Sequence, residues 1–229
     1  MLRYLFSGYS ALEIVVSLCA SVFVVFCCLP IHEYAHALAA TKLGDETARL
    51  SGRLTINPLA HISWIGALML LLVGFGYAKP VPVNINNFGY KHKKRDFALV
   101  SLAGPAANLI MALFFLFMYE FFLFLGARVF PDSSFIRALQ IFFNLAGNIN
   151  ISLAVFNLLP IPPLDGSRLL TAFVPDKYYY FLLRYERYIM LGLFVLLWLG
   201  WLSWPLNFLS TLVYKGFIWI VSLPFKLFS

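Results

Sequence analysis

Two histidines and one glutamate, in the stretch His32-Glu33-Tyr34-Ala35-His36, lie inside a hydrophobic segment long enough to cross a membrane. Histidines at this spacing share one face of a helix, so their ring nitrogens can converge on a single metal ion. Glu33 falls beside that face, where its carboxylate can take a proton from water held by the metal. Ionisable side chains are costly within lipid and usually have a function there. The pattern therefore predicts proteolysis by a metal site inside a bilayer.

A third metal ligand is expected elsewhere in the chain, because catalytic zinc usually takes three ligands from the protein and leaves a fourth position for water. Asp165 is the strongest candidate, since it follows a run of prolines that ends a hydrophobic segment. An Asp-Gly pair at a membrane exit can also be a simple turn. With the upstream pair in place, we expect His32, His36 and Asp165 to bind one Zn²⁺ per chain, with Glu33 as general base and acid.

Four other polar residues in or near the apolar segments are weaker candidates. Cys28 shares the helical face of His32 and is expected to pack as a small apolar residue, with metal binding as the alternative. His61 could cap a turn or support the metal site from outside its ligands. His92 lies in a basic run and is expected to be a solvated loop residue. Glu120 is explained as well by snorkelling or a helix–helix hydrogen bond as by a function.

The composition is that of a polytopic membrane protein: 62% of the 229 residues are hydrophobic and 12% are charged, where a soluble domain has about 25% charged residues. The excess of Lys and Arg needs no nucleic-acid partner, because positive loops are expected beside anionic lipid. No soluble segment is long enough for a separate folded module. We expect one all-α membrane-embedded domain over residues 1–229, with a catalytic core over 11–172 and C-terminal helices over 173–229.

Five segments are long enough to span the hydrocarbon core as helices, namely 11–41, 96–127, 135–158, 178–203 and 206–224. A sixth apolar run, 62–77, is shorter and is expected to re-enter the membrane without crossing it. Residues 48–58 alternate with Gly and Pro punctuation, which predicts a short strand or hairpin. The prolines within 79–84 predict an extended segment. The two segments are expected to be membrane-associated β segments around the zinc site.

The re-entrant run decides the topology. If 62–77 crossed fully, Asp165 would emerge on the opposite side of the membrane from the histidine pair, and the three ligands could not meet. If it re-enters, Asp165 returns to the same side, which then carries most of the Lys and Arg residues. The other side carries only Arg3, Arg128 and Arg137. Positive charge is retained in the cytoplasm, so the active site is expected toward the cytoplasmic face of a multi-pass membrane protein.

Over about residues 25–172, the chain resembles the site-2 protease family of intramembrane zinc metalloproteases. Three motifs in order carry the resemblance: His-Glu-x-x-His at 32–36, Gly-Pro-x-x-Asn at 104–108, and Asn-x-x-Pro-x-x-Pro-Leu-Asp-Gly at 157–166. It implies the same zinc ligands and the same base, and it implies that Asn157 and Asn108 contact substrate or stabilise the oxyanion. Asn108 could equally be an interhelical contact beside Gly104. Ser63 stands where many compact members have Asp.

The resemblance also implies a membrane-protein substrate, cut in or near its transmembrane segments. So compact a chain is expected in a prokaryotic plasma membrane. The sequence does not predict an oligomeric state. Two other classes compete with the enzyme. A transporter or proton relay would spread ionisable groups through the membrane depth, whereas the proposed groups cluster near one face. A catalytically inactive relative that only binds membrane proteins would not need an intact Glu33.

Overall fold

The computed structural model describes residues 10–61, 63–66, 68, 79–89, 92–170, 172–175, 177, 181–182 and 184–226. Within these residues all regular structure is helical, and four helices are long and apolar enough to cross a membrane. They cover Ala11–Lys42, Lys93–Arg128, Ser134–Asn157 and Ser203–Lys226. The expectation of an all-α membrane protein is therefore confirmed at this level.

The first span consists of three consecutive helical pieces, α2 (Ala11–Phe23), a π-helical turn η1 (Val24–Cys28) and α3 (Leu29–Lys42). A capping box starts it: Ser10 accepts from the Glu13 N–H at 3.3 Å, and Glu13 accepts from the Ser10 N–H at 2.9 Å. The π turn ends just before Pro30, which has no N–H to continue the α-helical pattern. Such turns change the register of a helix, often beside functional residues, and here the next turn carries His32.

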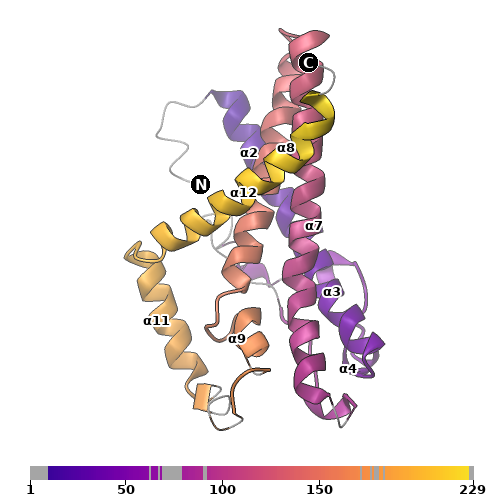
Figure 1. Ribbon diagram of the computed structural model, residues 1–229, viewed down its shortest axis with the longest axis vertical. Coiled ribbons are helices and arrows are strands. Elements are labelled where there is room, and N and C mark those ends of the chain that lie inside the picture. The colour runs from indigo at the N-terminus through magenta and orange to yellow at the C-terminus, as the bar shows by residue number, and fades with distance from the viewer. Residues whose placement is uncertain are drawn as a thin grey trace.

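Two long helices, α7 (Lys93–Arg128) and α8 (Ser134–Asn157), are joined by a short loop and pack on each other. Their shared core contains Ala112, Leu116, Ile151 and Val155. The last helix, α12 (Ser203–Lys226), runs obliquely across both and adds Val221 to that core (Figure 1). The predicted spans 96–127, 135–158 and 206–224 thus match helices whose ends differ by a few residues.

The described chain also contains α4 (Thr47–Leu50), α5 (Pro58–His61), the 3₁₀ turn η2 (Ile85–Asn87), α9 (Asp165–Leu170) and α11 (Glu186–Trp198). In Figure 1, α4 and α9 lie near the α3 end of the long helices. The predicted span 178–203 contains α11, which has 13 residues, whereas a perpendicular crossing needs about 20. Residues 178–180 and 183, and most of the predicted re-entrant run 62–77, lie outside the described residues.

The predicted strand or hairpin over 48–58 is wrong in the described structure. Residues 47–50 form α4, a turn follows in which Gly52 has φ of +67°, and α5 begins at Pro58. Local side-chain bonds favour these turns over strand pairing. Asp45 accepts from the Thr47 N–H at 3.1 Å, and Asn57 accepts from the Leu59 N–H at 3.1 Å. The segment 79–84 has no helix or strand, and Asn84 at its end is extended, with φ −109° and ψ 106°.

Candidate metal centre

The centre lies where α3 crosses α7, and Gly104 makes the close approach possible. A Cβ atom at Gly104 would overlap Nε2 of His36 and would lie 2.6 Å from Cε1 of both His32 and His36. Both imidazoles are buried there, on the same face of α3. The Gly-Pro-x-x-Asn motif therefore has a steric function, because its glycine leaves the volume that the two rings occupy.

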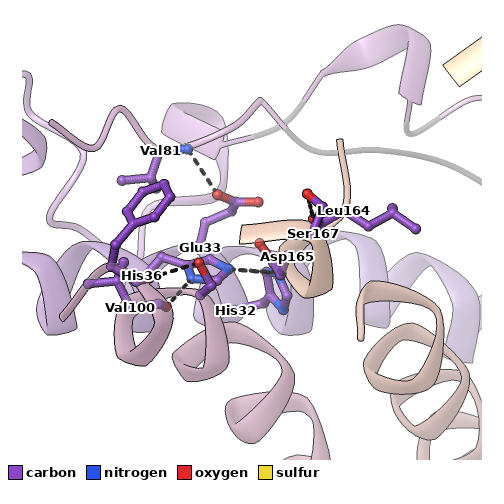
Figure 2. Close-up of polar contacts among 10 residues, drawn as sticks. His32, Glu33, His36, Val81, Val100, Leu164, Asp165 and Ser167 are labelled. Carbon is purple, nitrogen blue, oxygen red and sulfur yellow. Dashed lines mark hydrogen bonds and ion pairs between the residues drawn. The ribbon is translucent and has the colours of Figure 1, made fainter. Parts of the chain in front are cut away.

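Asp165 reaches the same point from the start of α9. Its Oδ2 lies 3.2 Å from Nε2 of His36 and 3.4 Å from Nε2 of His32, and the two Nε2 atoms are 3.1 Å apart (Figure 2). Among the His, Cys, Asp and Glu side chains of the described residues, these three lie close enough together to hold one metal ion. Their donor atoms come from segments more than a hundred residues apart.

The donor atoms fit a zinc ion both chemically and in their spacing. His36 Nδ1 lies 2.7 Å from the Val100 carbonyl oxygen, which can only accept a hydrogen bond, so Nδ1 carries the proton. In the neutral ring, Nε2 therefore presents a lone pair to the cluster. That lone pair faces the Asp165 carboxylate, another acceptor, and two such atoms repel unless a cation lies between them. Tetrahedral zinc with bonds of about 2.0–2.1 Å separates its ligands by about 3.3 Å, which agrees with the three distances.

The turn before α9 holds Asp165 in place. A Cβ at Gly166 would overlap the carbonyl oxygens of Leu158 and Leu159, so the chain folds tightly back against the end of α8. The guanidinium of Arg168 lies 5.8 Å from the centre of the Phe97 ring, which links α9 to α7.

Glu33 lies beside the cluster, with 7% of its surface exposed. Its Oε2 accepts a hydrogen bond from the backbone N–H of Val81 at 3.1 Å (Figure 2). Val81 belongs to the segment 79–84, which therefore contacts the carboxylate through its backbone. The sequence analysis did not single out Val81. The Pro-Val-Pro pattern of 80–82, in which one N–H stands between two prolines, is the feature that could have marked Val81 as an isolated backbone donor.

The two asparagines of the motifs are placed differently. Asn108 is fully buried on α7, and within the described residues neither atom of its amide has a hydrogen-bond partner. Asn157 is the last residue of α8, ahead of the turn that carries Asp165. No bond joins either amide to the metal cluster among the described residues. Their contact with substrate remains a prediction.

The weaker candidates lie outside the cluster. Cys28 is buried in a cluster with Val24, Phe115 and Ala146, and it is not among the described residues that could hold the metal ion. His61 is fully buried, and its Nε2 lies 2.7 Å from the Thr55 carbonyl oxygen, which closes the loop before α5.

His92 is exposed where α7 begins, as expected. Glu120 lies partly exposed on α7, in a part of the helix several turns from Gly104.

Four helices that are long and apolar enough to cross a membrane, together with a His-Glu-x-x-His cluster that could hold a metal ion, define the class of membrane metalloproteases. Known proteins agree. The model of Peptidase family M50 matches residues 129–200. The "Putative zinc metalloprotease YwhC" of Bacillus subtilis is 39% identical over 178 residues, which are 76% of this chain and 80% of that protein. The chain belongs to Peptidase family M50, the site-2 protease family. It is a zinc metalloendopeptidase.

More distant relatives carry a similar name. Rip2 of Mycolicibacterium smegmatis is 32% identical over 146 residues, or 60% of this chain, and Rip2 of Mycobacterium tuberculosis is 32% identical over 144 residues. The chain spans about half the length of these Rip2 proteins, 51% in each case. No solved structure matches the chain.

Proposed function

We propose that this protein hydrolyses peptide bonds in or near the transmembrane segments of membrane-protein substrates. The observation that carries the proposal is the convergence of His32, His36 and Asp165 Oδ2 within hydrogen-bonding distance of one another, between helices long enough to span a bilayer. These three residues would hold Zn²⁺. When bound, zinc lowers the pKa of a water molecule at its open position to about 7 and polarises the substrate carbonyl.

Glu33 is the general base and acid of this proposal. Its carboxylate accepts a proton from the attacking water as the oxygen–carbon bond forms at the scissile carbonyl. The carbon–nitrogen bond then breaks, and Glu33 delivers the proton to the leaving amine nitrogen. The amide of Asn157, at the end of α8, donates a hydrogen bond to the negative charge that develops on the carbonyl oxygen. Asn108 supports the same site from α7.

The proposal places the centre toward the cytoplasmic face of a plasma membrane, with the run 62–77 re-entering on that side. The two crossings 96–127 and 135–158, with the run 62–77 re-entering, keep Asp165 on the same face as the histidine pair, and most of the basic residues lie there. A helical substrate has its backbone hydrogen bonds satisfied within the helix. It must therefore unwind locally before a peptide carbonyl reaches the centre.

Zinc content and cleavage together test the proposal. The parent, purified in detergent, should hold about one zinc per chain, and Asp165→Ala should hold it at least about 10-fold more weakly, because one of three ligands is missing. Glu33→Gln should keep the zinc and lose cleavage of a labelled transmembrane peptide in micelles. A parent that binds no zinc would refute the site, and a Glu33→Gln variant that cuts like the parent would refute the base.

A further inference from the structure

Residues 79–84, which we term the strap, present one backbone donor to the proposed base. Pro80 and Pro82 have no N–H, so the N–H of Val81 is the donor that the sequence leaves between them. This N–H bonds to Oε2 of Glu33 at 3.1 Å, and Val81 has 5% of its surface exposed. The prolines also keep the strap extended, so the donor is fixed in direction before it meets the carboxylate.

Arg53 holds the other end of the same peptide group. Its Nη2 donates to the Pro80 carbonyl oxygen at 2.9 Å and also to the Lys79 carbonyl, while Nη1 donates to the Ala60 carbonyl. The Pro80 carbonyl and the Val81 N–H belong to one planar peptide unit. A buried guanidinium, 7% exposed, thus lies at the oxygen end of this unit, and the Glu33 carboxylate lies at its N–H end.

The two charges polarise the peptide unit in the same direction. A cation at the carbonyl and an anion at the N–H each strengthen the other's hydrogen bond, and such charge-assisted bonds are stronger than neutral ones. The strap is also tied at both ends: Lys79 N–H donates to the His61 carbonyl at 2.8 Å, and Asn84 N–H donates to Asp45 at 2.7 Å. The Val81 donor is therefore held against Glu33 by fixed contacts.

We propose that Arg53 is a positioning residue for peptide hydrolysis. It orients the Pro80–Val81 peptide so that the Val81 N–H holds Oε2 of Glu33, which leaves Oε1 as the oxygen that exchanges the proton. Arg53 acts through this peptide and not on the substrate. The inference rests on the proposed role of Glu33 and adds the residues that orient it.

The test uses the full-length protein loaded with cobalt in place of zinc, titrated with acetohydroxamate and followed by visible absorption. A hydroxamate chelates the metal and needs a neighbouring carboxylate to take its proton, so its affinity reports the orientation of Glu33 without any substrate. Arg53→Met and Val81→Pro should weaken binding by about 10-fold to 100-fold at unchanged metal content. Arg53→Lys, which can still bond one carbonyl, should lose less than Arg53→Met.

Two matched controls isolate the contact. Arg49→Met removes a nearby arginine whose side chain is exposed and paired with Glu46, and Val83→Pro makes the same change two residues along the strap. Both should bind acetohydroxamate within about 2-fold of the parent, since they leave the positioning contacts in place. Val81→Pro deletes the donor and keeps the Arg53 contacts, so it decides the matter if Arg53→Met fails to fold.

The outcomes separate the two proposals. Glu33→Gln should weaken hydroxamate binding at least as much as either positioning variant, and an unchanged affinity there would overturn the proposed base itself. If Glu33→Gln weakens binding while folded Val81→Pro binds like the parent, the base stands and the positioning role of Arg53 is overturned. Equal losses in Val81→Pro and Val83→Pro would likewise overturn it, because the effect would then come from the strap as a whole.

Discussion

Gly104→Ala is the smallest change that should empty the metal centre. The added methyl would lie 2.6 Å from Cε1 of His32 and of His36 and would overlap Nε2 of His36. Carbon atoms in contact are normally about 3.5–4.0 Å apart, so the rings must retreat by about 1 Å. Val100 lies on α7, as Gly104 does, and the 2.7 Å hydrogen bond from His36 Nδ1 to the Val100 carbonyl oxygen opposes that movement.

The loss of zinc should far exceed the loss of stability. Metal–ligand bonds tolerate about 0.2 Å of displacement, so a shift of about 1 Å removes His36 as a ligand. Loss of outer-sphere partners alone costs about 10-fold to 100-fold in affinity, and we expect at least about 100-fold here. Overpacking costs about 1–3 kcal/mol, and replacing a helical glycine by alanine returns up to about 1 kcal/mol. The fold should therefore survive.

Zinc affinity by chelator competition, with thermal unfolding of the metal-free proteins in parallel, measures both quantities. Gly192→Ala is the matched control, since a Cβ at Gly192 on α11 meets nothing within 4 Å; it should bind zinc like the parent. The reasoning fails if Gly104→Ala holds zinc as tightly as the parent. It also fails if the metal-free variant is unfolded, because the loss of zinc would then follow from the loss of the helix packing.

Three further changes probe the parts that support the centre. Burial raises the pKa of Asp45, but hydrogen bonds from Thr47, Asn84 and Asn87 outweigh it and lower that pKa. The ionised carboxylate therefore stabilises the fold above about pH 4, and this stabilisation is lost as the pH falls through the lowered pKa. The difference in Tm between the parent and Asp45→Asn should accordingly shrink between pH 6 and pH 3. Gly166→Ala should displace Asp165, because its methyl overlaps two carbonyl oxygens, and equilibrium dialysis should show weakened zinc binding. Leu116→Ala should cost about 2–5 kcal/mol of unfolding free energy with zinc binding unchanged, because Leu116 is fully buried between α7 and α8.

The long helices were predictable because a bilayer imposes a length on them. Apolar runs near 20 residues, bounded by polar or capping residues, set the ends of α2–α3, α7, α8 and α12 to within a few residues. The fourth predicted run, 178–203, had no such clear bounds, and its helix α11 is short. The meeting of Asp165 with the histidines was predicted from the need of catalytic zinc for a third ligand; the alternation of crossing segments allows that meeting only if the run 62–77 re-enters.

The connection between α3 and α7 could not be predicted in the same way. Gly and Pro over 48–58 fit a hairpin as well as consecutive turns, and the choice depends on distant partners. Asp45 is fully buried and accepts hydrogen bonds from Asn84, at the end of the strap, and from Asn87, just beyond it, at 2.7 Å each. Arg53 binds carbonyls more than 20 residues away. Such long-range bonds leave no periodicity in the sequence.

These same long-range bonds explain how the carboxylate of the proposed base can be held steady within a membrane helix. α3 fixes the Cα of Glu33, but a glutamate side chain still has three rotatable bonds, and a helix alone does not choose among their rotamers. The strap supplies the missing constraint with one N–H, and Arg53 supplies the charge that fixes the strap. Two of the proposed metal ligands come from the first span and the third comes from the start of α9, whereas the proposed base is oriented by a loop whose sequence looks like an ordinary connection.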